Sequence, residues 1–336
     1  MRFAALLLAC GAVALGGTMA EARLVAPEVS DLAITQDGFP RTLDEYGFFI
    51  HADVQIPTAD VMPYELNTPL YSDGADKLRF IYVPDGETIK ANADGLLQFP
   101  VGSAIIKTFA FGEGSDRRLI ETRVLLNRAD GWLALPYRWN EEQTEARLAL
   151  AGGRIPIITP AGEEISYRIP NKNQCKACHS LDDAVLPIGP KARNLAPELL
   201  ELLSEQGKLD AVPDVSRPMP RWSDANAAKE PLARAYLDVN CAHCHRPGGG
   251  ASNSGLDLRW EQDAPFARGV NKPPVAAGRG AGGLLVSIEP GDPDASILVH
   301  RMNSNEPGVA MPELGRSTID EEAVALMRDW IAEMGN

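Results

Sequence analysis

Two copies of one five-residue pattern, Cys175-Lys176-Ala177-Cys178-His179 and Cys241-Ala242-His243-Cys244-His245, decide the organisation of this 336-residue chain. Cys-x-x-Cys-His is the spacing at which a c-type haem is attached: two thiols bond to the porphyrin, and the next residue's imidazole becomes the proximal iron ligand. One helical turn brings both sulfurs to one porphyrin edge. The sequence therefore predicts two covalently bound haem c groups, the first on Cys175, Cys178 and His179, the second on Cys241, Cys244 and His245.

The remaining cysteine usage favours haem over zinc or disulfides. The fifth cysteine, Cys10, lies in an N-terminal stretch that we expect to be removed, so the other four all belong to the two motifs. Zinc sites with four cysteines usually hold their pairs roughly 15–20 residues apart, whereas roughly 60 residues separate Cys178 from Cys241. Disulfides in an exported protein do not need a histidine after each second cysteine. Zinc and disulfides remain the alternatives.

Residues 1–22 have the pattern of a secretory signal peptide. Arg2 provides the positive charge, an apolar run follows, and small residues near Ala20 or Ala22 provide a cleavage site. We therefore predict an exported, periplasmic protein, because c-type haem is attached outside the cytoplasmic membrane. Cys10 loosely resembles a lipidation site, but the apolar segment before it is unusually short, so lipidation is not expected. No later stretch is apolar and long enough for a transmembrane helix.

The charge of the chain limits its partners. It carries 46 acidic and 32 basic residues, a formal net charge of −14. This negative charge argues against nucleic acid or an anionic membrane surface as partner. It is compatible with a basic redox partner, and we expect a redox protein such as a periplasmic dehydrogenase or another cytochrome.

Residues 61–170 have the pattern of an antiparallel β domain. Short runs rich in β-branched and aromatic residues alternate with polar turns, which is typical of a sandwich or partial barrel. The expected strands are residues 78–83, 104–111, 117–127, 132–139, 145–150 and 164–169. The preceding residues 23–60 are Pro-rich and irregular, with one short helix expected at 43–49.

From residue 171 the pattern is helical. Apolar residues recur at helical spacing in 195–206, 231–240, 293–303 and 320–334. The helix at 231–240, the second haem motif, a Gly/Pro-rich loop and the C-terminal helix together resemble a class I cytochrome c. We therefore expect such a domain at 223–336, preceded by a shorter haem-one segment at 171–222. The predicted fold class is multidomain α+β, with an N-terminal β sandwich or partial barrel and a mainly α dihaem region.

A low-spin haem also needs a sixth iron ligand, usually a methionine thioether or a second histidine. For the second haem we expect Met311, which precedes Pro312 just ahead of the C-terminal helix. His300 and Met302 are the alternatives, although both fall in an expected helix where a core role is more usual. His243, between the two cysteines of its motif, is expected to point away from its own iron.

For the sixth ligand of the first haem, the sequence leaves more candidates open than for that of the second. Met219, in Pro218-Met219-Pro220, is the best candidate, and Met62, His51 or an open position are the alternatives. The segment Ile188-Gly189-Pro190 after His179 resembles the Gly-Pro segment that lies over the proximal histidine of class I cytochromes.

Several longer stretches of the sequence carry a resemblance to a known protein family. They are Leu66-Asn67-Thr68-Pro69-Leu70-Tyr71-Ser72-Asp73, Ile120-Glu121-Thr122-Arg123, Gly131-Trp132, Tyr137-Arg138-Trp139-Asn140, Asn171-Lys172-Asn173-Gln174-Cys175, Tyr236-Leu237-Asp238-Val239-Asn240-Cys241, Pro290-Gly291-Asp292-Pro293 and Met311-Pro312. With these stretches the chain resembles a family of bacterial periplasmic dihaem c-type cytochromes with an extra N-terminal β domain. The resemblance covers most of the chain after the signal. It implies covalent dihaem binding and electron transfer in the cell envelope, without a particular substrate.

The leading functional hypothesis is an electron carrier or the cytochrome subunit of an oxidoreductase. A dihaem peroxidase or oxidase is the main alternative, and it would need an open sixth position at haem one and acid–base groups nearby. A β-domain binding module that uses haem as a sensor is a third.

A final expectation concerns the pocket of haem one. Residues 171–222 offer little apolar surface to enclose a porphyrin. We therefore expect the β domain to pack on this segment and to form part of the haem-one pocket. The expected wall consists of Phe109, Phe111, Trp132, Tyr137 and Trp139.

Overall fold

The computed structural model describes residues 27–335. The predicted signal peptide at 1–22, including Cys10 and the cleavage site, lies outside the described residues. Within residues 27–335, no helix combines the length and the apolar composition that crossing a membrane requires.

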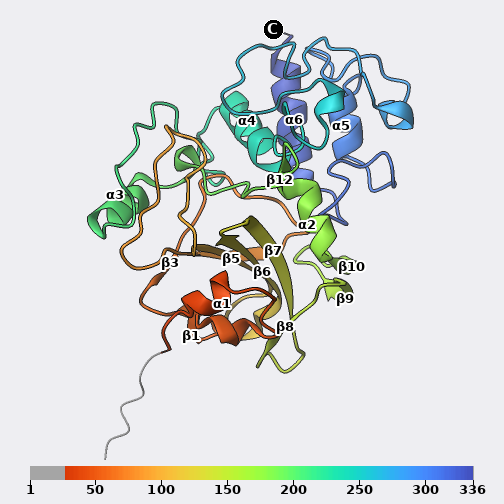
Figure 1. Ribbon diagram of the computed structural model, residues 1–336. Coiled ribbons are helices and arrows are strands. Elements are labelled where there is room, and N and C mark those ends of the chain that lie inside the picture. Colours follow the sequence, from red (N-terminus) through yellow and green to blue (C-terminus); the bar gives the residue numbers. More distant parts are fainter. Residues whose placement is uncertain (1–26, 336) are drawn as a thin grey trace, which may run out of the picture.

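The chain has an α+β fold that begins with one six-stranded antiparallel sheet and continues into a region with several helices (Figure 1). The sheet order is β3-β4-β5-β6-β7-β8, so each strand pairs with its neighbours in sequence. Its strands are β3 Val61–Pro63, β4 Asp76–Tyr82, β5 Ala104–Phe111, β6 Arg118–Arg128, β7 Gly131–Trp139 and β8 Ala146–Leu148. The structure confirms the strands predicted between residues 78 and 150 and places all of them in this sheet.

Three two-stranded sheets complete the β structure. They pair β1 Phe49–His51 with β2 Ile56–Pro57, β9 Gly153–Ile158 with β10 Glu164–Ile169, and β11 Ser180–Leu181 with β12 Ala184–Val185. The predicted strand at 164–169 is β10, but its partner β9 was not predicted. Gly and Pro disfavour strands, and β9 begins at Gly153 and contains Pro156. The turn before β9 contains Gly152, whose φ is 69°.

The α-helices are α1 Asp31–Thr35, α2 Lys172–His179, α3 Pro197–Glu205, α4 Lys229–Asn240, α5 Ile297–Met302 and α6 Glu321–Glu333. The 3-10 helices are η1 Leu43–Tyr46, η2 Gly114–Asp116, η3 Ala192–Asn194, η4 Ser252–Ser254 and η5 Gly278–Ala281. Helices α3 to α6 confirm the four helices predicted from residue 195 onward. The helix predicted at 43–49 is only the 3-10 turn η1, because Gly47 adopts a φ of 71° and ends it before β1.

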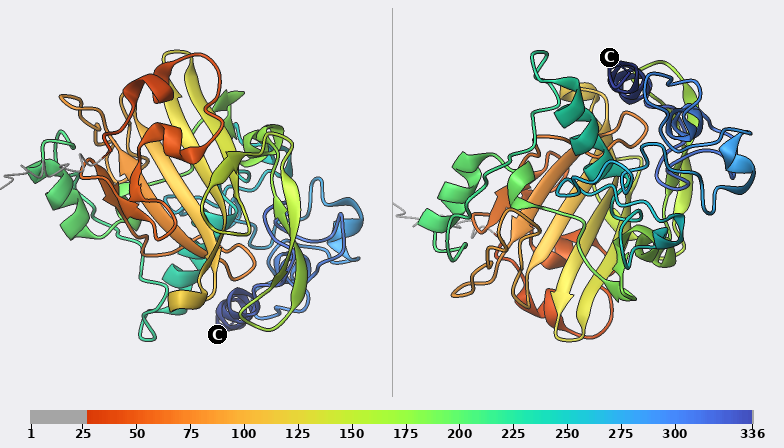
Figure 2. Two further views of the ribbon diagram at one scale, coloured as in Figure 1. Left: turned by 90° about the horizontal axis from the view of Figure 1, so that it is seen from below. Right: turned by 90° about the horizontal axis from the view of Figure 1, so that it is seen from above.

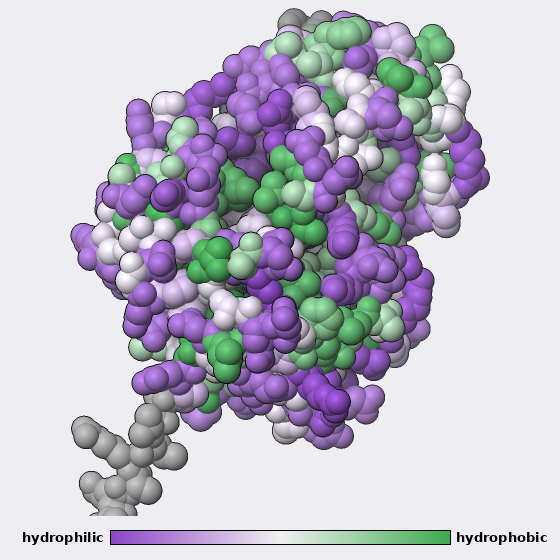
Figure 3. All heavy atoms as spheres, in the orientation of Figure 1, coloured by the Kyte–Doolittle hydropathy of each residue, from purple (hydrophilic) through white to green (hydrophobic). Residues whose placement is uncertain are grey.

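Helices α4, α5 and α6 lie together at one end of the molecule, and α2 lies between them and the large sheet (Figure 1). The same separation of the sheet from the C-terminal helices is visible from two further sides in Figure 2. The face drawn in Figure 3 is largely hydrophilic, with hydrophobic residues in scattered patches.

The two faces of the large sheet are covered by different parts of the chain. One face packs on α1, η1 and β1. The other face, which carries Ile81, Ile105 and Leu125, packs on Cys175 of α2 and on Leu200 of α3. The expected packing of the β domain on the haem-one segment is confirmed by this shared core.

Part of the expected aromatic wall is wrong. Tyr137 and Trp139 lie in the core on the α1 side of the sheet, whereas Trp132 packs on the side of Cys175. Successive residues of a strand point to opposite faces, and Trp132 is separated from Tyr137 and Trp139 by an odd number of positions. Phe109 and Phe111 lie in a further cluster with Tyr167 of β10.

The loop at residues 66–73 forms hydrogen bonds with three later parts of the chain. The Thr68 N–H donates to Asn194 Oδ1 at 2.8 Å, which holds the haem-one segment. The Tyr71 N–H donates to Asn240 Oδ1 at 2.8 Å, at the end of α4. Asp73 Oδ1 accepts from the Thr318 N–H at 2.9 Å, just before α6. This loop is also the longest of the stretches on which the family resemblance rests.

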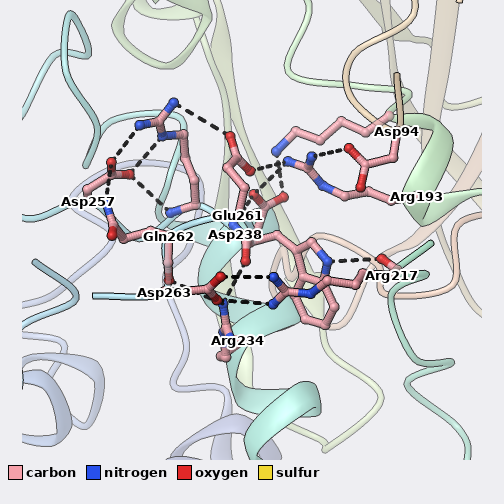
Figure 4. A network of polar contacts seen from close by, with 12 residues as sticks. Asp94, Arg193, Arg217, Arg234, Asp238, Asp257, Glu261, Gln262 and Asp263 are labelled. Atoms are coloured by element: carbon pink, nitrogen blue, oxygen red, sulfur yellow. Dashed lines mark hydrogen bonds and ion pairs between the residues drawn. The ribbon is translucent and has the colours of Figure 1, made fainter. Parts of the chain in front are cut away.

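A buried ion-pair network joins the haem-one segment to α4 (Figure 4). The fully buried Asp238 accepts from Lys191 Nζ at 2.5 Å and from the Trp260 N–H at 3.0 Å, and Arg193 lies 3.4 Å away. Burial alone would raise the pKa of Asp238, but Lys191 and Arg193 outweigh it and hold the pKa below its usual value. The carboxylate therefore stays ionised and fixes two cations at this junction.

Replacing Asp238 by alanine should lower the free energy of unfolding by about 3–5 kcal/mol, because it removes the ion-pair partner of Lys191 and one of the three carboxylates around the buried Arg193. Urea unfolding of the purified protein measures the loss. Asp263→Ala is the matched control, since Asp263 is exposed although it pairs with Arg217 and Arg234, and its loss should be much smaller. Equal losses in the two variants would contradict a structural role for the buried network.

Candidate haem-binding sites

The first motif lies on α2, whose start is fixed by a reciprocal cap. Asn171 Oδ1 accepts from the Gln174 N–H at 2.8 Å, and Gln174 Oε1 accepts from the Asn171 N–H at 3.0 Å. Such a capping box satisfies two N–H groups at the beginning of a helix. The helix places Cys175 in the core shared with the sheet, while Cys178 and His179 are half-buried. The sequence Asn171-Lys172-Asn173-Gln174-Cys175 is therefore a helix start that positions the first thiol.

His179 is held in the form that binds a metal through Nε2. Its Nδ1 lies 3.0 Å from the carbonyl oxygen of Leu186. A carbonyl only accepts, so Nδ1 carries the proton and Nε2 keeps its lone pair. Burial, assisted by the charge of Lys107, lowers the pKa of His179 to about 4, so the ring is neutral at pH 7. The carbonyl lies just before the Ile188-Gly189-Pro190 segment noted in the sequence.

The second motif follows α4 directly. Its histidine, His245, is also oriented by a hydrogen bond at Nδ1. His245 Nδ1 lies 2.9 Å from Ser254 Oγ, and Ser254 Oγ donates to the Ala251 carbonyl at 2.7 Å. Because the hydroxyl proton is used there, the serine oxygen accepts from Nδ1 and leaves the Nε2 lone pair free. Burial, with Arg301 contributing, lowers the pKa of His245 to about 4. Orientation of a ligating histidine through its other nitrogen is the usual arrangement at metal centres.

A cavity of about 510 Å³ lies beside the second motif. Its walls include Cys241, Cys244 and His245, together with Met311 and Met302. Apolar side chains such as those of Leu258, Ile288 and Ile297 line much of the rest. The volume falls within the range of about 300–1,000 Å³ that is typical of cofactor sites. The structure therefore brings the predicted proximal and distal residues of haem two together in one cavity.

Of the two alternative distal ligands for haem two, only Met302 lines this cavity. His300 instead packs against Gly282, where an added Cβ would lie 2.5 Å from His300 Nε2. A hydrogen bond fixes the backbone of Met311, since the Met311 N–H donates to the Arg301 carbonyl at 3.0 Å. Met302 is buried in the core formed with α4 and α6.

A cation with buried nitrogen atoms in this cavity also fits a haem. Arg268 lines the cavity, and its Nε and one terminal nitrogen are buried without a hydrogen-bond partner among the described residues. Its nearest carboxylate, on Glu230, lies 3.6 Å away. Buried polar groups are normally hydrogen-bonded, and a guanidinium suits an anionic group such as a haem propionate. The cavity therefore holds a set of groups that fits haem c. They are two thiols, a neutral imidazole, a thioether and a cation. No simple sequence pattern identified Arg268 or Ser254.

The two motifs meet at Cys178, His243 and Cys244, whose sulfur and ring nitrogen atoms lie within 4.8 Å of one another. The close approach of the two sulfurs lowers the pKa of Cys178 and raises that of Cys244. The Asp182 N–H donates to the Gly248 carbonyl at 3.2 Å and holds the segments together. His243 Nδ1 is buried here without a hydrogen-bond partner in residues 27–335.

This trio is also a possible metal site, with two sulfurs and one imidazole. A structural zinc site usually has four protein ligands. A metal on these three residues would leave Cys175 and Cys241 without a role. It would also leave His179 and His245 without a role, although a hydrogen bond to Nδ1 orients each ring. Haem attachment uses all four cysteines and both of those histidines.

The candidate distal ligands of haem one lie in different places. Met219 is buried with Ala235 and Val239 of α4 and with Trp260, a cluster separate from the one that contains Cys175. Met62 packs against the cluster of Cys175. His51 is exposed in β1. The structure thus brings the predicted ligands of the second haem together in one cavity, but it does not do so for the predicted ligands of the first haem.

Comparisons of the chain with protein-family models, with curated proteins and with solved structures found no match.

Proposed function

We propose that this protein is a periplasmic dihaem c-type cytochrome that transfers electrons, either as a carrier or as the cytochrome subunit of an oxidoreductase. The observation that carries the proposal is the cavity lined by Cys241, Cys244, His245 and Met311. These residues are the two attachment points, the proximal ligand and the distal ligand of one haem. The acidic net charge of −14 supports a basic redox protein as partner.

The contact between the motifs supports transfer from one haem to the other. Cys178 and Cys244 are each the second cysteine of a motif, and their sulfurs belong to the group within 4.8 Å. If each sulfur holds a porphyrin edge, the two edges lie side by side at this contact. Electrons would then pass between the haems without an intervening protein segment.

The bound haem would supply an iron that alternates between the ferric and ferrous states. His179 and His245 would hold it through Nε2, with their rings oriented by the Leu186 carbonyl and by Ser254. The Met311 thioether would favour the ferrous state of haem two. Arg268 would compensate a propionate charge inside an otherwise apolar cavity.

A dihaem peroxidase or oxidase is the second candidate, and the position of Met219 favours it. Met219 packs on α4 and not in the cluster of Cys175. If another residue does not take its place, the sixth position of haem one is open to a substrate such as peroxide.

Carbon monoxide added to the ferrous protein separates these two functions. An electron carrier with two six-coordinate haems should show no spectral change, because ferrous haem binds carbon monoxide only at an open or displaceable position. Met311→Ala provides the positive control, with carbon monoxide bound at haem two. If carbon monoxide binds stoichiometrically to one haem of the unmodified protein, and the protein also turns over peroxide, the enzyme is the correct function and the electron carrier is not.

A further inference from the structure

Three cations stand in one row across the large sheet, on the face that packs against the haem-one segment. Arg79 of β4 lies directly opposite Lys107 of β5, and Lys107 lies directly opposite Arg123 of β6. In the next row Lys77, Phe109 and Glu121 are aligned in the same way. Because side chains alternate along strands, both rows share the face that carries Ile81, Ile105 and Leu125.

Three of the four cations in these two rows lie close to a single aromatic ring. Lys77 Nζ lies 5.9 Å, Lys107 Nζ 5.3 Å and the Arg123 guanidinium carbon 4.2 Å from the centre of the Phe109 ring. Like charges directly opposite each other destabilise a sheet. A negative charge beside such a row would relieve this repulsion.

The described residues supply only part of that charge. Glu121 binds Arg123 through two contacts, at 2.9 and 2.5 Å, and also accepts from the Tyr167 hydroxyl at 2.8 Å. Arg79 donates to the carbonyl of Lys77 at 3.0 Å. In residues 27–335 the Lys107 ammonium forms neither a hydrogen bond nor an ion pair. Burial, together with the neighbouring cations, lowers the pKa of both Lys77 and Lys107 to about 7.

The cationic rows lie beside the first haem motif. The charges of Arg123 and Glu121 act on the Cys175 thiol, and the charge of Lys107 acts on His179. Helix α2 also packs against β7, the strand next to β6. The row therefore lies on the sheet face that packs against the first haem motif.

We propose that Arg79, Lys107 and Arg123 form the anion-binding part of the haem-one site and that they bind its propionate carboxylates. This inference rests on the proposed function. A haem carries two carboxylates, and among the described residues Glu121 is the one carboxylate that is hydrogen-bonded to the row of Arg79, Lys107 and Arg123. Covalent attachment through Cys175 and Cys178 keeps these carboxylates at a high effective concentration, so a tethered anion occupies the row in preference to a free one. The β domain thus neutralises the cofactor as well as covering it.

Lys107→Met in the mature holoprotein tests the inference. Mass spectrometry should still show two haems. The midpoint potential of haem one should fall, because an uncompensated propionate stabilises ferric iron, while that of haem two stays unchanged. The resonance Raman bands of propionate bending should shift for haem one. Lys107→Arg should restore both readouts, and Lys90→Met, which removes an exposed lysine of the same domain, should change neither.

Arg79→Gln gives the same readouts if Lys107→Met does not mature. Two haems with an unshifted potential and unshifted propionate bands in either variant would overturn the inference and leave the proposed function intact. A wild-type haem-one spectrum that responds saturably to added phosphate, with the response lost in Lys107→Met, would show that a free oxyanion occupies the row and would overturn the propionate assignment. A wild-type protein without haem would overturn the proposed function itself.

Discussion

Met311→Ala should abolish at least half of the weak long-wavelength absorption band that methionine ligation gives to the ferric protein. It should also lower the midpoint potential of haem two, because a thioether favours the ferrous state. Met311 and His245 line the same cavity, and the Met311 backbone is fixed to the Arg301 carbonyl. Visible spectra of the oxidised protein and a potentiometric titration measure the two effects.

Met302→Ala is the matched control, because Met302 lines the same cavity but is buried in the core with α4 and α6. That variant should lose stability and keep the absorption band. If Met302→Ala removes the band and Met311→Ala does not, the distal ligand of haem two is Met302.

Removing both cysteines of one motif should delete one haem and change the other. In the Cys241→Ala/Cys244→Ala variant we expect haem one alone, with a shifted potential and a narrower electron paramagnetic resonance signal than in the dihaem protein. The reason is the contact of Cys178 with Cys244, which would bring two haems attached to these sulfurs close enough to interact magnetically and electrostatically. Mass spectrometry counts the haems, and the resonance spectrum reports their coupling.

The reciprocal variant, Cys175→Ala/Cys178→Ala, should leave haem two alone with the same loss of coupling. Cys10→Ala should change neither haem, since Cys10 belongs to the predicted signal. Identical potentials and line shapes in the dihaem protein and in the single-haem variants would show that the haems are too far apart to act as a relay.

Many of the local features of this fold can be predicted from the sequence. Short alternating runs between polar turns predicted β4 to β8, and apolar residues at helical spacing predicted α4 and α6. The pattern Cys-x-x-Cys-His predicts haem attachment without knowledge of the fold, because its two cysteines and its histidine lie within five consecutive residues.

The features that depend on distant parts of the chain could not be read in this way. The face on which Tyr137 and Trp139 lie depends on which segment covers each side of the sheet. The row of Arg79, Lys107 and Arg123 arises only from the register of three strands. The approach of Cys178 to Cys244 depends on how α2 packs against the loop after α4. Each of these is set by tertiary packing and not by local pattern.

The most direct test of the central claim is the mass of the exported protein after denaturation. Denaturation removes zinc and noncovalent ligands but leaves thioether bonds intact. A chain that begins after Ala20 or Ala22 and carries the mass of two haems is the predicted result. A chain with four free thiols, accompanied by zinc in the native protein, would contradict the cytochrome assignment and favour a metal site at Cys178, His243 and Cys244.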